Sequence, residues 1–285
     1  MQIATHSGPF HADDLFAVAI LKLVHPDATV LRTRDKEQLA GADYRVDVGQ
    51  VYNPETNDYD HHQPGGAGQR ENEIPYAAAG LVWKKYGPQI TSDAVVEKID
   101  NKLIGPIDAN DNGVELFEKP KLYPYTISTF FKLYAPDWQD TTQDFDAAFM
   151  RALELATFIL TQEIKRAEGV LKAEQIVADA IKQSDGAIII LPQFVPWKRH
   201  AITLSQAIYC IYEAHDGTWR CHAIPEKEGD FAVRKELPAS WGGLEDEALQ
   251  QASGVPDAVF CHKGLFLAGA QSKEGALSLA RKALE

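Results

Sequence analysis

This sequence has few cysteines, no long apolar run and no excess of basic residues. The three cysteines (Cys210, Cys221 and Cys261) are an odd set without CxxC spacing, which argues against disulfides and zinc–thiolate sites and is typical of buried thiols in a reducing compartment. No apolar stretch approaches the roughly 20 residues that a membrane span needs. The 28 basic and 41 acidic residues give a net charge of −13, which excludes a protein that binds nucleic acid through its overall field.

The chain has 285 residues, of which 45 % are apolar and 24 % charged, enough for one large α/β domain or two smaller ones. Its first residues have neither the basic and apolar regions of a signal peptide nor the composition of a transit sequence. We therefore expect a cytoplasmic protein with no membrane partner.

The first half of the sequence alternates short apolar strands with helical patterns. The predicted elements are strands at residues 3–5, 29–33 and 44–48 and helices at residues 13–24, 77–86 and 94–107. Strands separated by helices indicate an α/β fold with a doubly wound, mainly parallel sheet.

A helical pattern with few breakers runs from residue 145 to about 183, as one long helix or as two that join near Gly169. A smaller C-terminal α/β domain follows, with predicted strands at residues 187–191, 207–213 and 219–224, a hairpin turn at Asp216-Gly217 and a final helix at residues 273–284. We expect one domain at residues 1–183, including the helical linker, and a second at residues 184–285.

Metal-binding side-chain types gather in the first domain. Four of the nine histidines lie in two short motifs, THSGPFHADD at residues 5–14 and DYDHHQ at residues 58–63. Asp47 ends the strand between them, and an apolar helix runs into the acidic segment IDANDNG at residues 107–113. Each motif falls at the end of a predicted element, and ligands bind at the carboxyl edge of parallel sheets.

A buried aspartate at a strand end needs a positive partner, which a metal ion would supply. Histidine and aspartate together suit Mn²⁺, Mg²⁺ or Zn²⁺. Singly, each motif also has an ordinary explanation: a strand-end histidine can hydrogen-bond locally, Asp13 can favour a helix N-terminus, and Asp108 or Asp111 can form a turn. Their joint occurrence in one α/β unit favours a metal site.

The spacing excludes several well-known sites. The sequence has no HxH pair of an amidohydrolase, no HxHxDH of a metallo-β-lactamase and no HExxH of a zinc peptidase. The glycine run GGAG at residues 65–68 has no following Lys-Ser/Thr, so it is not a Walker A loop.

Together the motifs resemble the MYG exonuclease family (melanocyte proliferating gene one), a branch of the DHH phosphoesterase superfamily. The resemblance rests on residues 5–14, 46–49, 59–63, 79–81 and 107–113, and extends to FCHKG at residues 260–264. It covers nearly the whole chain. The family's first motif often reads HCDE where this chain has HADD at residues 11–14, and the second of its C-terminal pair of glycines is Ala270 here.

The resemblance implies a metal-dependent phosphodiesterase, and in particular a 3′→5′ exonuclease acting on RNA or short oligonucleotides. It implies two divalent cations, with Mn²⁺ as our first expectation and Mg²⁺ as the alternative. The first cation would be held by His6, His11 and Asp47, and the second by Asp13, Asp47, His61 and Asp108. Cations about 3.5–4 Å apart would activate a water and stabilise the attacking and leaving oxygens.

The resemblance also implies a catalytic pair beside these ligands. His62 would act as a general acid or orient the phosphate, and Asp60 would fix an imidazole.

The second domain offers two candidate substrate contacts. The segment WKRH at residues 197–200 suits a phosphate and a stacked base, although a solvated loop has the same composition. The turn-like segment at residues 262–264 could contact a phosphate through its lysine and backbone N–H groups. The predicted substrate-binding residues are Lys198, Arg199, His200, His262, Lys263 and Gly264.

Three functions stay open at this point. The leading one is an exonuclease on RNA ends or short oligonucleotides. The second is a phosphoesterase acting on pyrophosphate or on a cyclic or linear dinucleotide, and the third is a non-catalytic metal-binding regulatory protein. The complete ligand set argues against the third. A homo-oligomer is compatible with the sequence, which does not decide it.

Overall fold

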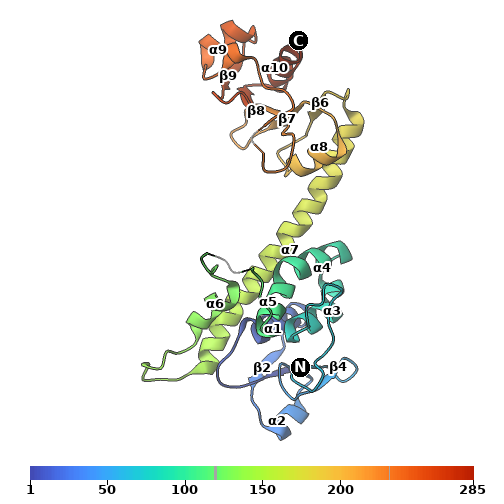
Figure 1. Cartoon of the computed structure of the whole chain (residues 1–285), viewed down its shortest axis with the longest axis vertical. Helices are drawn as coiled ribbons and strands as arrows, with labels where there is room; N and C mark the ends of the chain where they lie inside the picture. The colour runs from blue at the N-terminus through green and yellow to red at the C-terminus, as the bar shows by residue number, and fades with distance from the viewer. Residues whose placement is uncertain (119–120, 231) are drawn as a thin grey trace. The chain divides into compact units, whose positions relative to one another are not determined.

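The computed structural model describes residues 1–118, 121–230 and 232–285 (Figure 1). The chain forms two compact units, Met1–Glu168 and Gly169–Glu285. The division falls inside helix α7 (Phe145–Gln183), which is one uninterrupted helix and contributes residues to both units. The domain boundary that we expected after residue 183 would instead assign all of α7 to the first domain.

The first unit contains a mainly parallel sheet with the strand order β2–β1–β3–β5–β4. Its parallel strands are β1 (Gln2–Thr5), β2 (Thr29–Arg32), β3 (Tyr44–Val46) and β5 (Asp58–Tyr59), and β4 (Tyr52–Asn53) pairs antiparallel with β5. The predicted α/β class with a mainly parallel N-terminal sheet is therefore confirmed.

Helices α1 (Ala12–Val24) and α3 (Ala78–Ile90) pack against each other in this unit. Apolar residues recur at helical spacing in both helices, and Phe16 of α1 and Trp83 of α3 are among the largest side chains that are completely buried. The Trp83 indole donates a hydrogen bond to Val96 O at 3.1 Å, which satisfies its buried N–H.

The helix predicted at residues 94–107 is interrupted. It consists of α4 (Asp93–Ile99), a π-helical turn (Asp100–Ile104) and α5 (Gly105–Asp111). Pro106 lies at the start of α5, and a proline cannot donate the backbone hydrogen bond that a regular α-helix needs there. Shorter helical elements of this unit are α2 (Lys36–Gly41), α6 (Ile127–Phe131) and a 3₁₀ turn (Lys132–Tyr134).

The second unit contains a mixed sheet with the order β6–β7–β8–β10–β9. Its strands are β6 (Ile188–Ile190), β7 (Tyr209–Glu213), β8 (Trp219–Ala223), β9 (Ala258–Cys261) and β10 (Leu267–Ala270). Strands β7 and β8 form the predicted antiparallel hairpin, and only β6 and β7 pair in parallel.

Alternate residues of β7 face two separate apolar clusters. Tyr209 and Ile211 pack with residues of α9 (Asp246–Ser253) and α10 (Lys273–Leu284), whereas Cys210 and Tyr212 pack with residues of α7 and α8 (Lys198–Leu204). This period of two is the expected signature of a strand that is covered on both faces. A 3₁₀ turn (Ala239–Trp241) joins the first cluster.

All three cysteines are free and buried, as the sequence predicted. Within the described ranges, the structure contains no helix with the length and apolar character that crossing a membrane requires.

Candidate metal centre

Three neighbouring parallel strands end at the candidate site. His6 directly follows β1, Asp47 directly follows β3, and residues 60–62 directly follow β5. Since β1, β3 and β5 are adjacent, their carboxyl ends bring these side chains to one edge of the sheet. His11 joins them as the N-cap residue of α1.

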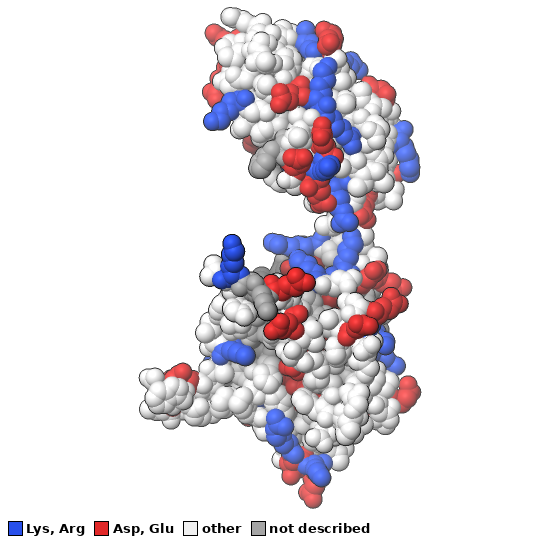
Figure 2. Space-filling model, viewed as in Figure 1, with Lys and Arg blue, Asp and Glu red and all other residues white. Residues whose placement is uncertain are grey.

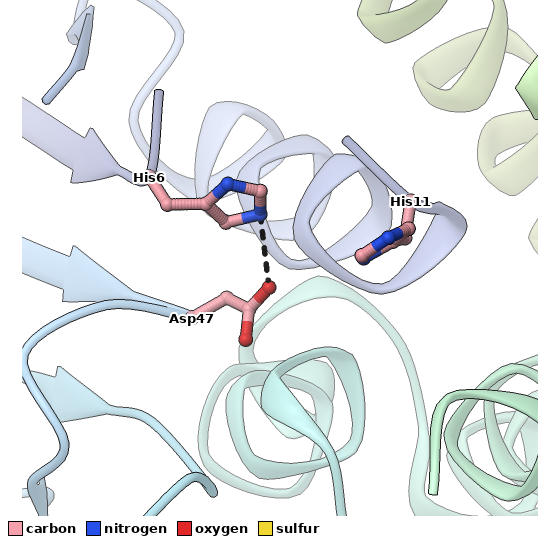
Figure 3. A group of neighbouring side chains, drawn as sticks. All are labelled: His6, His11 and Asp47. Carbon is pink, nitrogen blue, oxygen red and sulfur yellow. Dashed lines mark ion pairs between the residues drawn. The ribbon is translucent and has the colours of Figure 1, made fainter. Parts of the chain in front are cut away.

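The first of three His/Asp groups consists of His6, His11 and Asp47, which each offer one ligand atom within 4.8 Å of the others (Figure 3). His6 Nε2 lies 3.3 Å from Asp47 Oδ2. Figure 3 shows these two side chains facing one another from adjacent strand ends, with His11 at the start of α1. This group equals the ligand set expected for the first cation.

The second group is Asp13, His61 and Asp111, and the third is Asp47, His61 and His62. His61 Nε2 lies 3.1 Å from Asp111 Oδ2 and 3.5 Å from Asp47 Oδ1. Asp47 thus belongs to the first and third groups, and His61 belongs to the second and third. The three groups form one continuous cluster.

Several buried atoms of this cluster lack hydrogen bonds. Among the described residues, Asp14 Oδ2, Asp47 Oδ1 and His61 Nε2 are inaccessible to solvent and have no partner with hydrogen-bond geometry. Such atoms are costly unless something else satisfies them. A divalent cation coordinated by oxygen and imidazole nitrogen would do so, so the donor set fits a metal ion.

The pKa values of the cluster report its need for positive charge. Burial lowers the pKa of His6, but ion pairs with Asp14 and Asp47 outweigh burial and raise the pKa to about 10. Burial likewise opposes protonation of His61, yet Asp111 and Asp47 raise its pKa to about 11. Without metal, these imidazoles therefore hold protons that neutralise the carboxylates.

The pKa values of two aspartates of the cluster are shifted in opposite directions. Burial and then the charge of Asp47 raise the pKa of Asp13 well above its usual range. Burial also raises the pKa of Asp47, but the ion pairs with His6 and His61 outweigh burial and the net pKa is lowered. Asp47 therefore stays ionised to a lower pH than Asp13.

The backbone of Asp47 is in the left-handed region, with φ of +52°. Its amide donates a hydrogen bond of 3.0 Å to Tyr59 O, which extends the β3–β5 pairing by one residue. A non-glycine residue at positive φ is strained, and such strain concentrates at functional sites. In this conformation the carboxylate lies beside His6 and His61.

Asp60 holds the adjacent histidine in place. The side chain is 1 % exposed, and its carboxylate accepts hydrogen bonds from the backbone amides of Gln50, His61 and His62. His62 Nδ1 lies 2.8 Å from Asp60 Oδ1, and because this carboxylate accepts every bond, Nδ1 carries the proton. The opposite nitrogen, Nε2, is then free on a ring that is half exposed.

Asp108, a predicted ligand, lies in none of the three groups. Its Oδ2 accepts a bond of 2.8 Å from Arg70 Nη1, and its Oδ1 accepts a bond of 3.0 Å from Gly80 N. Burial raises its pKa to about 7 despite the opposing charge of Arg70. Asp111, one helical turn later in α5, belongs to the second group.

Two further residues were missed by the sequence analysis as cluster members. Asp111 stood in the acidic segment, but of that segment only Asp108 was assigned as a ligand. Asp14 lies 3.1 Å from His6 Nε2 and is completely buried. The adjacent pair Asp13-Asp14 was the available signal, because two carboxylates in one buried helical turn need a cation nearby.

A pocket of about 550 Å³ lies beside the cluster. The cluster residues in its wall are His6, His11, Asp13, Asp47, Asp60, His62 and Asp111. Arg34, Ser128 and Lys132 line the same pocket and were not predicted. On the face that Figure 2 shows, Lys and Arg side chains are interspersed with Asp and Glu.

The predicted substrate contacts of the C-terminal domain lie in the second unit. Lys198 and Arg199 line a pocket of about 530 Å³ at the start of α8, but Trp197 is 1 % exposed and His200 is 6 % exposed. The buried indole therefore offers little face to a stacking base. His200 Nε2 lies 3.4 Å from Glu174 Oε1.

Residues 262–264 form the turn between β9 and β10. The ring of His262 accepts a hydrogen bond of 3.0 Å from Gly264 N and packs against Phe266, with 4.4 Å between ring centroids. Lys263 is exposed. The roles of both segments in substrate binding stay predictions.

Known proteins match this chain over nearly its whole length. The sequence pattern of an uncharacterised protein family, UPF0160, matches residues 2–284. The MYG1 exonuclease of Mus musculus is 33 % identical over 325 residues, which cover 99 % of this chain and 84 % of that protein. A MYG1 protein of Saccharomyces cerevisiae is 33 % identical over 323 residues, covering 99 % and 95 %.

Among solved structures, the pGpG-specific phosphodiesterase PggH from Vibrio matches with a TM-score of 0.33 and 14 % identity, over 99 % of this chain and 96 % of that chain. A likeness at this level carries no argument. The family match and the relatives, with coverage from end to end, are decisive: the chain belongs to the MYG1 exonuclease family.

Proposed function

We propose that this protein is a metal-dependent phosphodiesterase that acts as a 3′→5′ exonuclease on RNA or short oligonucleotides. The observation that carries the proposal is the continuity of the His/Asp cluster, in which Asp47 and His61 each belong to two candidate ligand groups. Shared ligands are what a site for two close cations requires. The names of the MYG1 exonuclease relatives support the reaction class.

We assign His6, His11 and Asp47 to one cation and Asp13, Asp47, His61 and Asp111 to the other, with Asp47 shared. Bound there, the cations would lower the pKa of the attacking water and stabilise negative charge on the attacking and leaving oxygens. Mn²⁺ is our first choice and Mg²⁺ the alternative. Asp111 replaces Asp108, whose carboxylate is occupied by Arg70 and Gly80.

His62 acts on the substrate in this proposal. Asp60 fixes the Nδ1 proton, so that Nε2 faces solvent beside the cluster and can orient the phosphate or, when protonated, donate a proton to the leaving oxygen. The four bonds that Asp60 accepts hold the ring in one orientation. Asp60 is thus a positioning residue.

A second candidate substrate is a small molecule, such as pyrophosphate or a dinucleotide. The volume of the pocket favours it, because about 550 Å³ falls within the range of small-ligand sites. A short oligonucleotide whose terminal residues enter the pocket would satisfy the same observation. A homo-oligomer and a cytoplasmic location stay predictions.

One experiment separates these functions. Purified protein is incubated with Mn²⁺ or Mg²⁺ and end-labelled RNA, DNA, dinucleotides or pyrophosphate, and the products are compared over time. We expect mononucleotides released one at a time from the 3′ end of RNA, and no reaction in chelator. Exclusive cleavage of pyrophosphate or dinucleotides would favour the second candidate, and no cleavage despite bound metal would contradict both.

A further inference from the structure

Two cations that line the pocket of the acidic cluster are unpaired. Arg34 and Lys132 are exposed, and neither side chain makes an ion pair or hydrogen bond with another part of the described chain. By contrast, the neighbouring Arg32 is bound to Asp146 at 2.8 Å and to Gly8 O at 2.6 Å. Positive side chains near so many carboxylates commonly pair with them, so these two are available to another anion.

Both cations come from backbone that is held in place. Arg34 lies between Thr33, whose amide donates to Thr5 O at 2.8 Å, and Asp35, whose amide donates to Thr33 Oγ1 at 3.0 Å. The first bond ties the Arg34 loop to the end of β1, next to His6 in the sequence, and the second holds the turn of the loop itself. The guanidinium is therefore delivered to the same sheet edge as the cluster.

Lys132 is the first residue after α6. It lies four positions after Ser128, which also lines the pocket. Residues four apart share one helical face, so Ser128 and Lys132 are presented together. Phe131 is completely buried on the other side and meets Phe16 edge to face, with 5.8 Å between centroids. This contact fixes the lysine-bearing turn on α1.

We propose that Arg34 and Lys132 form a subsite for a second phosphate of the substrate, separate from the phosphate at the His/Asp cluster. The inference rests on the proposed phosphodiesterase function and adds a specificity to it. A guanidinium and an ammonium with free donors suit phosphate oxygens. The pocket has room for a substrate of dinucleotide size. The second phosphate would therefore be a terminal phosphate, one nucleoside away from the phosphodiester that is cleaved.

The test compares three substrates that differ only in a terminal phosphate: the RNA dinucleotides ApA, pApA and ApAp. We expect the wild type to prefer pApA or ApAp over ApA by about 10-fold or more in kcat/KM. The variants Arg34→Gln and Lys132→Gln should each lose about 10-fold on the preferred substrate and less than about 2-fold on ApA. Lys36→Gln, an exposed cation outside the pocket, is the matched control.

Metal content is measured on every sample, so that a lost cation cannot imitate a lost phosphate contact. Equal losses on all three substrates, or no preference by the wild type, would overturn the subsite. A loss in Lys36→Gln as large as in Arg34→Gln would do the same, because it would reflect overall charge.

A binding measurement keeps the subsite testable if the proposed function fails. Each dinucleotide is titrated calorimetrically into the wild type and the Arg34→Gln/Lys132→Gln double variant in EDTA, where both proteins carry the same bare cluster. Tighter binding of pApA or ApAp than of ApA, lost in the double variant, supports the subsite even without turnover. Equal affinities in both proteins overturn it.

Discussion

Both units bury histidine beside a pocket, but with opposite consequences for its charge. In the first unit, carboxylates raise the pKa of His6 to about 10. In the second unit, burial and the charge of Lys198 lower the pKa of His222 to about 4. His222 instead bonds Tyr212 Oη at 3.1 Å and lies among aromatic rings.

The comparison separates the effect of burial on a histidine pKa from the effect of the neighbouring side chains. Burial disfavours the charged imidazole in both units, and only the company of aspartates reverses its effect. The first unit is therefore built to hold positive charge, either as protons or as metal ions. The pocket of the second unit is built to keep its histidine neutral.

The largest expected effect is the loss of the shared carboxylate. Asp47→Asn should reduce kcat by about 10³-fold or more, because an amide cannot supply the charge that both cations need. Asparagine tolerates positive φ nearly as well as aspartate, so the fold should persist. Activity and metal content are measured together, and apo stability should fall, because the ion pairs with His6 and His61 that lower the pKa of Asp47 are lost.

The control for Asp47→Asn is Asp27→Asn, an exposed aspartate outside the cluster. It should leave rate and metal content unchanged. A wild-type kcat in Asp47→Asn would show that Asp47 does not serve both cations.

The two adjacent histidines should differ in kind. His61→Ala should lose metal and activity together, with partial rescue by excess Mn²⁺, because His61 belongs to two ligand groups. His62→Ala should keep its metal and lose about 10²–10⁴-fold in kcat, the usual contribution of a positioned acid. His62 also belongs to one of the three groups, so it is the alternative ligand. Equal metal loss in both variants would show that both histidines bind metal and would contradict this division.

The neutral histidine of the second unit predicts an acid-sensitive stability. His222 is neutral at pH 7 in the folded and unfolded chain, but between about pH 6.5 and 4 only the unfolded chain gains the proton. Stability should therefore fall as the pH drops through this window, by at most about 3 kcal/mol. Denaturant unfolding of wild type and His222→Gln would measure it.

In His222→Gln this part of the pH dependence should disappear, whereas His215→Gln, at an exposed position, should keep it. Identical pH profiles of His222→Gln and the wild type would show that His222 is not protected from protons.

The smallest expected effects come from two glycines that make room for a carboxylate, one in each unit. A Cβ at Gly80 would lie 1.8 Å from Asp108 Oδ2, and a Cβ at Gly275 would lie 2.1 Å from Asp257 Oδ1. Gly80→Ala and Gly275→Ala should each cost about 1–3 kcal/mol of stability.

Only Gly80→Ala should also weaken metal binding, because Asp108 anchors the helix that carries Asp111. Thermal unfolding and Mn²⁺ titration separate the two effects. Gly41→Ala, where a Cβ meets nothing within 4 Å, is the control. Unchanged Mn²⁺ affinity in Gly80→Ala would mean that Asp111 is placed without Asp108.

The sequence predicted what local periodicity and motif position can encode. The final helix appears at residues 273–284 as expected, and the predicted strand at residues 29–33 differs from β2 by one residue. Strands β4 and β5 were missed because two residues are too short to show alternation. Strands β9 and β10 were also missed, because they are only four residues long and the LAGA sequence of β10 consists mostly of small residues without a polar alternation.

The ligand set was harder to predict wherever distant residues decide it. Asp108 and Asp111 lie in one acidic segment, and nothing local distinguishes them. Arg70, which lies 38 residues before Asp108, forms an ion pair with Asp108, whereas Asp111 is left to pair with His61. The pocket cations Arg34 and Lys132 carry no motif and are recognisable only once the chain has folded around them.

The length of α7 has a practical consequence for dividing the protein. Ala173 and Val177, from its second half, pack in the core of the second unit with Ile189 and Cys210. A fragment that begins at residue 184 would expose these partners and should aggregate, whereas one that begins near Gly169 keeps them covered. Isolated expression of the C-terminal unit must therefore start in the middle of a helix.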